Sequence, residues 1–314
     1  MMKKNVLKSI LFVIFFVVIT EILTYVVLPG SNVRKMGMIK VATYEVLGEQ
    51  KNTIDVAVIG DSLVYSSLSP MVIWNEFGYT TFDCSNPAQL ITESYGNLEA
   101  VTETQKPKIV ILEANELFRD DKHKKLKYKM EVLYRKLIPI ATYHNNWKNY
   151  FMYGGKDNWI NIYKGYKYIT KVESGKSNYE MTYSSKKEVI PDKNKEYFDK
   201  IYELCKKNNI KLVVVSFPTQ ISWNYKKHNA TETLLEKYSD VEFIDLNTVD
   251  LGIDWKKETK DEGGHLNYLG ARKVSTYIGE YIKSTELVED KRGNKKYASW
   301  DEAYKKYVFY SNNQ

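Results

Sequence analysis

The stretch IDVAVIGDSLVYSSLSP, from Ile54 to Pro70, decides the fold of this 314-residue chain. It opens with β-branched and small apolar residues that do not alternate with polar ones. That pattern is typical of a strand covered on both faces of a parallel sheet. The run breaks at Gly60-Asp61-Ser62. Ser62 is therefore expected just past the end of a buried strand, either as a nucleophile or as part of a strand-to-helix turn.

Five short apolar segments of this kind occur along the chain, with helical patterns between most of them. The clearest helical patterns are Thr92–Thr104, Lys195–Asn208 and a helix after Asn267, which is suited to cap it. Strands that alternate with helices predict an α/β domain with a doubly wound, five-stranded parallel sheet. Ligands of such sheets bind beyond the carboxyl ends of the strands, where Ser62 is expected. The predicted strands are Asp55–Ile59, Thr80–Asp83, Lys108–Leu112, Lys211–Ser216 and Val241–Leu246.

A long apolar run from Ile10 to Leu28 follows a basic N-terminus. The run is long enough to cross a hydrocarbon core of ~30 Å as a helix. Lys3, Lys4 and Lys8 on its leading side predict a cytoplasmic N-terminus. No small-residue cleavage motif follows, so we expect one uncleaved transmembrane anchor rather than a signal peptide. The rest of the chain is then expected outside the cell membrane.

One segment interrupts the alternation of strands and helices. It separates the third and fourth strands and is far longer than a crossover requires. Its Tyr, Lys and Asn residues suit a lid or a polymer-binding surface, or simply a solvated region with ordinary aromatic packing. Near the C-terminus, Ser299 and Glu302 have capping-box spacing and predict one more helix. The expected parts are the anchor (1–30), a linker (31–52), the α/β domain (53–284) with the insertion (119–194), and a helical tail (285–314).

The net charge and the positions of the cysteines narrow the range of partners and of chemistry that the sequence allows. The net charge of +7 suits a protein that works beside anionic lipids or anionic wall polymers. The expected membrane topology argues against nucleic acid as a partner. The only cysteines, Cys84 and Cys205, are far apart in sequence and have no metal-ligand spacing. We expect two buried free thiols.

One histidine is placed to activate Ser62. A serine attacks an acyl carbon only if a base takes its proton and hydrogen-bond donors stabilise the resulting oxyanion. His265 lies in the sequence DEGGHLNYLGA, in a loop after the last predicted strand, so it should emerge at the same edge of the sheet as Ser62. Asp261 and Glu262 lie just upstream, and either can orient the imidazole. This mechanism requires no metal and no organic cofactor, and we expect none.

These motifs, in this order, resemble the signatures of the SGNH (GDSL) hydrolase superfamily. Gly60-Asp61-Ser62-Leu63 is similar to the first signature, Asn115 within KPKIVILEANELF to the third, and His265 with its acid to the last. The resemblance runs from about residue 53 to residue 284, apart from the insertion, and implies a three-layer, flavodoxin-like SGNH fold. It is nearest to the membrane-anchored, extracellular branch. That branch includes the teichoic acid D-alanyl transfer protein DltD and the SGNH-type O-acetyltransferases of exopolysaccharides.

Two positions depart from the family pattern. The resemblance implies an oxyanion hole built from the Ser62 N–H, the Asn115 side chain and an N–H from the second signature. Where the family has glycine in that signature, the stretch CSNPAQL has Ala88, which still carries an N–H. The family acid is usually an aspartate three residues before the histidine, and here Glu262 stands at that position. Glu262 is therefore the expected triad acid, with Asp261, one residue earlier, as the alternative.

The resemblance implies that Ser62 carries an acyl group, acetyl or D-alanyl, to a cell-surface glycan or teichoic acid. The expected donor is a multi-pass membrane-bound O-acyltransferase, since an anchored transferase must stay beside the source of its acyl groups. Two alternatives stay open. One is an extracellular SGNH carbohydrate esterase or deacetylase, because nothing in a triad distinguishes water from a sugar hydroxyl. The other is a non-catalytic scaffold subunit of a polymer-modifying complex, which the Ala88 and acid departures would allow.

Overall fold

The computed structural model places the chain in two units, and each is described by itself. One unit holds residues 1–48 and 122–159, and the other holds residues 49–121 and 160–314. Most of the predicted linker and much of the predicted insertion, with His123 and His144, lie outside the described residues. The described residues are 2–27, 46, 49–119, 162–177 and 179–312, with the single positions 130, 133, 138 and 140.

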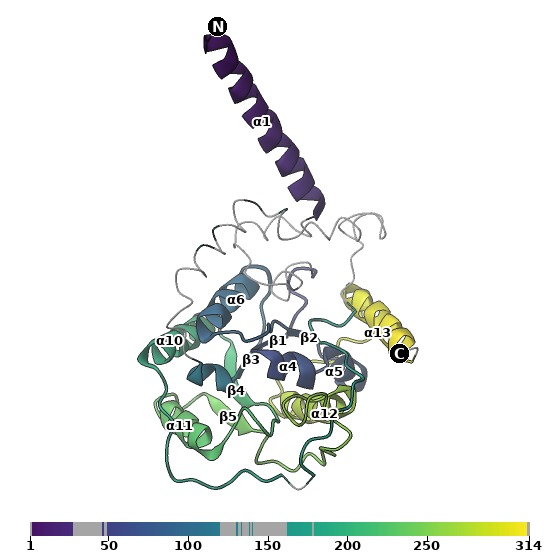
Figure 1. Cartoon of the computed structure of the whole chain (residues 1–314). Helices are drawn as coiled ribbons and strands as arrows, with labels where there is room; N and C mark the ends of the chain where they lie inside the picture. The colour runs from purple at the N-terminus through teal and green to yellow at the C-terminus, as the bar shows by residue number, and fades with distance from the viewer. Residues whose placement is uncertain are drawn as a thin grey trace. The chain divides into compact units, whose positions relative to one another are not determined.

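In the first unit, helix α1 runs from Met2 to Val27 (Figure 1). Its segment Asn5–Thr24 has a mean hydropathy of 2.5, and by length and composition it is able to cross a membrane. A helix of 26 residues extends for about 39 Å at 1.5 Å per residue, which exceeds the hydrocarbon thickness of a bilayer. A signal sequence near an N-terminus passes the same test.

The second unit is built on a five-stranded sheet in which every neighbouring pair is parallel. The strand order is β2-β1-β3-β4-β5, the flavodoxin-like order of a doubly wound sheet. This confirms the predicted fold class, and each strand end lies within one residue of its predicted position. The strands are β1 (Val56–Ile59), β2 (Thr81–Asp83), β3 (Ile109–Glu113), β4 (Lys211–Ser216) and β5 (Glu242–Asp245).

The strand order reverses direction between β1 and β3, and this switch point positions the candidate site. The register pairs Ile59 of β1 with Leu112 of β3, so the two strands end side by side. The chain continues from β1 toward β2 on one side and from β3 toward β4 on the other, and ligands of such sheets bind beyond the strand ends at this point. Ser62 and Asn115, which follow these two strands, therefore converge at one place.

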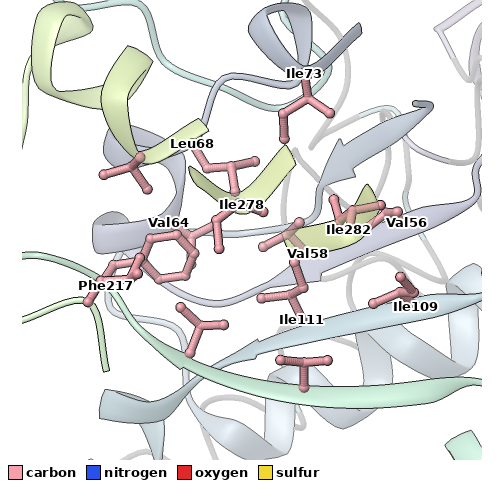
Figure 2. Packing of buried hydrophobic residues seen from close by; sticks show 14 of the residues in the cluster. Val56, Val58, Val64, Leu68, Ile73, Ile109, Ile111, Phe217, Ile278 and Ile282 are labelled. Atoms are coloured by element: carbon pink, nitrogen blue, oxygen red, sulfur yellow. The ribbon is translucent and has the colours of Figure 1, made fainter. Parts of the chain in front are cut away.

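Helices α4, α5 and α12 close the main apolar core on one face of the sheet (Figure 2). Val56 and Val58 of β1 and Ile111 of β3 belong to this core together with Val64 of α4 and Ile278 of α12. Because β1 and β3 are buried along their whole length, neither strand shows polar alternation in the sequence. The three helices are α4 (Ser62–Ser67), α5 (Pro70–Phe77) and α12 (Tyr268–Ser284).

Helices α6 and α10 pack against each other, α6 also against β1 and α10 also against β4 (Figure 1). Both helices were predicted, and α12 begins after Asn267, whose side chain accepts the Leu269 N–H at 3.0 Å as expected of a cap. The short helices of the strand connections were not predicted, because they are too brief for a periodic pattern. The further bounds are α6 (Ile91–Thr104), α10 (Asp192–Lys207), α11 (Tyr225–Leu235) and the 3₁₀ helix η1 (Ala114–Phe118).

The C-terminal tail forms a 3₁₀ helix, η4 (Lys295–Tyr297), followed by α13 (Ala298–Ser311). The predicted helix exists, but the predicted capping box is wrong. The N-cap residue is Tyr297, without a side-chain cap, and Glu302 pairs instead with Lys306 at 2.9 Å. The buried ring of Trp300 packs 5.5 Å from that of Trp74 in α5, so tertiary packing rather than capping holds the start of this helix.

Both cysteines are buried and neither forms a disulfide, as predicted. Burial raises the pKa of the Cys205 thiol to about 12, so this thiol stays protonated and unreactive near neutral pH. Cys84 is fully buried beyond β2. Neither cysteine therefore offers an accessible alternative nucleophile to Ser62.

Candidate active site

Ser62 is the first residue of α4 and follows closely on the end of β1. Asp61 caps the helix, since its Oδ1 accepts the N–H of the residue after Ser62 at 2.8 Å. Gly60 allows the chain to pass close to β3, because a Cβ at this position would lie 2.3 Å from Val64 Cγ2 and 2.6 Å from Glu113 Cβ. Close packing thus explains Gly60, and helix capping explains Asp61. Ser62 remains partly exposed.

The structure brings Ser62, His265 and Asp261 into one hydrogen-bonded line. The Nε2 atom of His265 lies 2.8 Å from Ser62 Oγ, and its Nδ1 atom lies 2.6 Å from Asp261 Oδ2. With the proton on Nδ1, the imidazole donates to Asp261 and accepts the hydroxyl proton of Ser62. This is the arrangement of nucleophile, base and orienting acid that a serine triad requires. Ser62 and His265, which lie near opposite ends of the α/β domain in sequence, are therefore in contact in the structure.

Asp261, and not the preferred Glu262, is the carboxylate that contacts His265 in the structure, so the preference for Glu262 is corrected. Asp261 accepts two hydrogen bonds from His265, one from Nδ1 and one from the backbone N–H at 2.6 Å. Glu262 is exposed and has a φ of +56°, a left-handed conformation in the turn between acid and base. The physical reason is the extra residue between acid and histidine. The turn directs residue 261 toward the ring and leaves residue 262 in solvent.

Neighbouring segments hold the loop that carries the catalytic histidine. Gly263 has a φ of +92°, and a Cβ there would lie 2.4 Å from Gln220 Oε1, so a glycine is required. The backbone N–H of Gln220 donates to the Gly263 carbonyl at 2.8 Å, and Thr219 Oγ1 donates to the Gly264 carbonyl at 2.9 Å. The segment after β4 thus fixes the two glycines that precede the base.

The C-terminal part of the predicted insertion also contacts this loop. The Glu173 N–H donates to the Thr259 carbonyl at 3.0 Å, and the Glu173 carbonyl accepts the Glu262 N–H at 3.2 Å. The Tyr268 N–H, at the start of α12, donates to the Ile169 carbonyl at 2.9 Å. This part of the insertion is therefore hydrogen-bonded to the chain both before and after His265.

Asn115 follows β3 on η1 and is nearly fully buried. Its Oδ1 atom accepts a hydrogen bond from Lys227 Nζ at 2.8 Å, and the same ammonium donates to the Ser222 carbonyl at 2.9 Å. Because the lysine contacts the amide oxygen, the amide nitrogen is the atom that is left to donate to an oxyanion. Burial lowers the pKa of Lys227, which lies in the first turn of α11. The oxyanion role of Asn115 stays a prediction, and the lysine gives its amide a fixed orientation.

We expect Lys227→Met to reduce kcat about tenfold to a hundredfold toward a simple ester, with little change in KM. The reason is that a misoriented oxyanion donor weakens the transition state more than the ground state, and loss of one such donor costs ~10²–10³ in kcat. Lys227→Arg keeps a charged donor and should retain most of the rate. Lys226→Met, at the exposed neighbouring position, is the matched control. Equal kcat in the Lys227→Met and control proteins would contradict the orienting role.

Ala88, the predicted third oxyanion donor, lies in an exposed loop next to the nucleophile turn. The backbone N–H of Asn86, two residues earlier, donates to the Gly60 carbonyl at 3.2 Å. Ala88 has a φ of +51°, a left-handed conformation that costs an L-residue roughly 1–2 kcal/mol and that glycine adopts freely. Alanine thus occupies the backbone conformation for which glycine is better suited, and its part in the oxyanion hole stays a prediction.

Three carboxyl groups lie buried beneath the nucleophile turn. Asp61 forms an ion pair with Arg119, whereas Glu113 and Glu116 have no ion-pair partner among the described residues. Burial, together with the nearby Asp61 charge, raises the pKa of Glu113 well above its ordinary value. Burial also raises the pKa of Glu116 to about 8, although Ser94 donates a hydrogen bond to it. Glu116 is therefore largely protonated at neutral pH, and burial favours the neutral form of Glu113 as well.

The buried Glu116 makes stability depend on pH. Its pKa is about 8 in the folded protein against an ordinary value of 4.5, so the unfolded state loses its proton first as pH rises. Stability from this group is complete below about pH 4.5 and declines up to about pH 8. Glu116→Gln has no carboxyl group that titrates at this position. The Tm of the variant minus the Tm of wild type should therefore be larger at pH 8 than at pH 5. Each kcal/mol corresponds to roughly 2–4 °C in a domain of this size. A Tm difference that is the same at both pH values in thermal melts would refute this.

Several residues of the site carried no recognisable signal in the sequence. Lys227 and Arg119 enter it through contacts between distant segments, and a single lysine or arginine is too common to stand out. His228 also pairs with a carboxylate, Asp245, at 2.7 Å from Nδ1. Because Asp245 is buried and lies in β5, this second pair fixes α11 to the sheet. Among the described residues, no group of His, Cys, Asp or Glu side chains could hold a metal ion.

Comparison with known proteins adds a set of solved structures of low similarity. No family model and no curated protein matches the chain. A protein from Desulfitobacterium hafniense assigned to the G-D-S-L lipolytic family is 14% identical over 73% of this chain and 99% of its own, with a TM-score of 0.40. A family 3 carbohydrate esterase from Clostridium thermocellum is 12% identical over 74% and 97%, with a TM-score of 0.40.

A lipase/acylhydrolase from Enterococcus faecalis is also similar, at 13% identity over 76% of this chain and 100% of its own, with a TM-score of 0.38. These neighbours are described as GDSL-type lipolytic proteins and esterases. At these identities and TM-scores the likeness assigns no activity to this chain. The fold and the site themselves define a flavodoxin-like α/β unit with a Ser–His–Asp line at its topological switch point.

Proposed function

We propose that this chain is an SGNH-type serine acyl-transfer enzyme that works through an acyl-Ser62 intermediate. The observation that carries the proposal is the position of His265, within hydrogen-bond reach of both Ser62 and Asp261. A serine that only begins a helix needs no imidazole at its hydroxyl and no carboxylate behind that imidazole. Ser62 and His265 are both partly exposed, so a substrate can reach them.

In the first half of the reaction, Ser62 Oγ attacks the carbonyl carbon of an ester while His265 Nε2 takes the hydroxyl proton. The carbonyl oxygen becomes an oxyanion, held by the Asn115 amide nitrogen and by the Ser62 and Ala88 N–H groups. Asp261 stabilises the imidazolium that forms. When the oxyanion collapses, the bond to the leaving alcohol breaks, and His265 returns the proton to that alcohol. The acyl group remains on Ser62.

In the second half, His265 takes a proton from the acceptor hydroxyl, whose oxygen attacks the acyl-serine. The same donors hold the second oxyanion, and its collapse restores Ser62 with the proton from His265. Water as acceptor gives hydrolysis. A sugar or polyol hydroxyl gives acyl transfer, provided that the acceptor occupies the site in place of water.

For the finer function, we propose transfer of an acetyl or D-alanyl group to a cell-surface polysaccharide or teichoic acid. The support is α1, an apolar helix long enough to anchor the domain in a membrane. We propose that its N-terminus is cytoplasmic, that the α/β unit is extracellular and that a multi-pass membrane-bound O-acyltransferase supplies the acyl group. An anchor keeps a transferase beside its donor, whereas a hydrolase of free glycans gains little from it.

The second candidate function is a carbohydrate esterase or deacetylase. The solvent exposure of the triad favours it, because 40% of the Asp261 side chain and 23% of the His265 side chain remain exposed. Water reaches such a site readily. An acyl-serine there would hydrolyse unless a bound acceptor displaced the water.

One experiment separates these functions. The full chain in non-ionic detergent is treated with p-nitrophenyl acetate, and intact-protein and peptide mass spectrometry follow the acyl adduct on Ser62. We then add a neutral hexosamine oligosaccharide or a poly(glycerol phosphate). A long-lived adduct that either polymer discharges, with acetyl appearing on that polymer, supports the transferase. Rapid turnover in water without polymer acetylation supports the esterase. The absence both of an adduct on Ser62 and of Ser62-dependent release of p-nitrophenol would favour the non-catalytic scaffold.

A further inference from the structure

Tyr65 lies one turn after Ser62 on α4 and joins the nucleophile to its surroundings. Its side chain is buried, and the neighbouring Ser62 side chain opposes the effect of that burial on the pKa of the Tyr65 hydroxyl. Burial raises the pKa of the Tyr65 hydroxyl, so the phenol is neutral at physiological pH. A charge placed over the Tyr65 ring is therefore one side chain away from the reacting oxygen.

Two lysines lie over that ring. Lys167 Nζ is 4.2 Å from the centroid of the Tyr65 ring, and Lys260 Nζ is 5.8 Å from it. They come from separate segments. Lys167 lies in the C-terminal half of the predicted insertion, and its N–H donates to the Tyr65 carbonyl at 2.9 Å, whereas Lys260 directly precedes the triad acid Asp261. We call this pair, Lys167 and Lys260, the lysine rim.

Within the part of the chain that the structure describes, neither lysine of the rim forms an ion pair with a carboxylate. Lys171, by contrast, has its Nζ atom 2.6 Å from Glu173. The nearest acid in sequence, Asp261, is engaged by the catalytic histidine. Burial lowers the pKa of Lys260, and the charges of Lys167 and Lys171 act in the same direction, against the opposing influence of Asp261.

We propose that the lysine rim binds a negative charge on the substrate, next to the ester that Ser62 attacks. The site would then select anionic substrates, those with a phosphate or carboxylate group near the acyl ester, over neutral sugars. This inference rests on the proposed function and narrows it. Two like charges over one ring, with Lys260 partly buried and Lys167 exposed, raise the local potential, and a bound anion is the partner that offsets their repulsion.

A purely structural role for these lysines makes a different prediction. Stacking of an ammonium over a tyrosine ring contributes about 0.5–1 kcal/mol at an exposed site, whatever the substrate. If packing were the only role, removing the lysines would change the reaction of every ester by the same factor. Charge recognition instead changes the ratio between charged and neutral esters.

The test uses three phenyl acetates that differ in charge: methyl 4-acetoxybenzoate, 4-acetoxybenzoate and 4-acetoxyphenyl phosphate. The kcat/KM of each is measured with the full chain in non-ionic detergent and divided by its rate of alkaline hydrolysis, which corrects for leaving-group reactivity. For wild type, we expect both anionic esters to exceed the neutral ester. Their advantage should shrink as the salt concentration rises, because salt screens exposed charges. The carboxylate and phosphate probes show which anion the rim prefers.

In the double variant Lys167→Gln/Lys260→Gln, the anionic-to-neutral ratio should fall roughly tenfold, the order expected for losing charge pairs of modest strength. Activity on the neutral ester reports that the variant is folded. Lys167→Arg/Lys260→Arg should keep the ratio, and Lys200→Gln, which removes an ion-paired lysine of α10, should not change it. A ratio that is equal in wild type and the double glutamine variant overturns the proposal while Ser62-dependent hydrolysis stands. If no ester acylates Ser62, the proposed function itself fails, and this inference falls with it.

Discussion

The Ser62→Ala protein is expected to form no acyl adduct at the active site and to release p-nitrophenol from p-nitrophenyl acetate at least ~10⁴-fold more slowly than wild type. Loss of the nucleophile removes the covalent route, and only the oxyanion donors remain to assist water. His265→Ala should lose a similar factor, since Ser62 Oγ then has no base at 2.8 Å. Because these residues act as a unit, the double variant should be scarcely slower than either single one.

Ser284→Ala is the matched serine control, because its hydroxyl is exposed and donates to the Tyr281 carbonyl of its own helical turn. It should keep full activity. The assay combines the release of p-nitrophenol with mass spectrometry of the peptide that carries residue 62. An unchanged rate in Ser62→Ala would mean that another nucleophile or non-specific hydrolysis accounts for turnover, and the proposed mechanism would be abandoned.

The second large effect separates two adjacent carboxylates. Asp261→Asn should lower kcat by ~10³–10⁴, because an amide next to Nδ1 favours the wrong imidazole tautomer and cannot stabilise the imidazolium. Glu262→Gln should change kcat less than about twofold, since that side chain is exposed in the turn and takes no part in the hydrogen-bonded line. The two variants carry the same chemical change at neighbouring positions, so each is the control for the other.

Steady-state kinetics with p-nitrophenyl acetate and the acylation rate of Ser62 both report this difference. Thermal melts show whether each of the two variants is folded. This control is needed because Asp261 Oδ1 also accepts the His265 N–H and supports the loop. If Glu262→Gln were slower than Asp261→Asn, Glu262 would be the residue that orients His265 in solution. The acid would then lie three residues before the histidine, as in the resembled family. The assignment of Asp261 would then be wrong.

The sequence alone determined the architecture and the pair of residues at its centre. Short apolar segments without polar alternation are typical of a sheet covered on both faces, so strands such as Val56–Ile59 and Ile109–Glu113 were visible from residue order. The topology of such a sheet directs the ends of its parallel strands to one edge. That rule placed Ser62 and His265 together although 203 positions separate them. The Asn267 cap followed from a local pattern in the same way.

The tertiary structure alone decided which acid faces His265 and which side chains surround the nucleophile. Spacing favoured Glu262, but a single extra residue in the turn exchanges the roles of the two carboxylates, and only the backbone path shows this. The contact of Lys227 with Asn115 and the lysine rim over the Tyr65 ring join segments that are distant in sequence. Strand and helix patterns arise from local periodicity, whereas such contacts depend on how separate loops pack against one another. Sequence therefore predicts the scaffold and its nucleophile, and packing sets the charge and orientation of the groups around them.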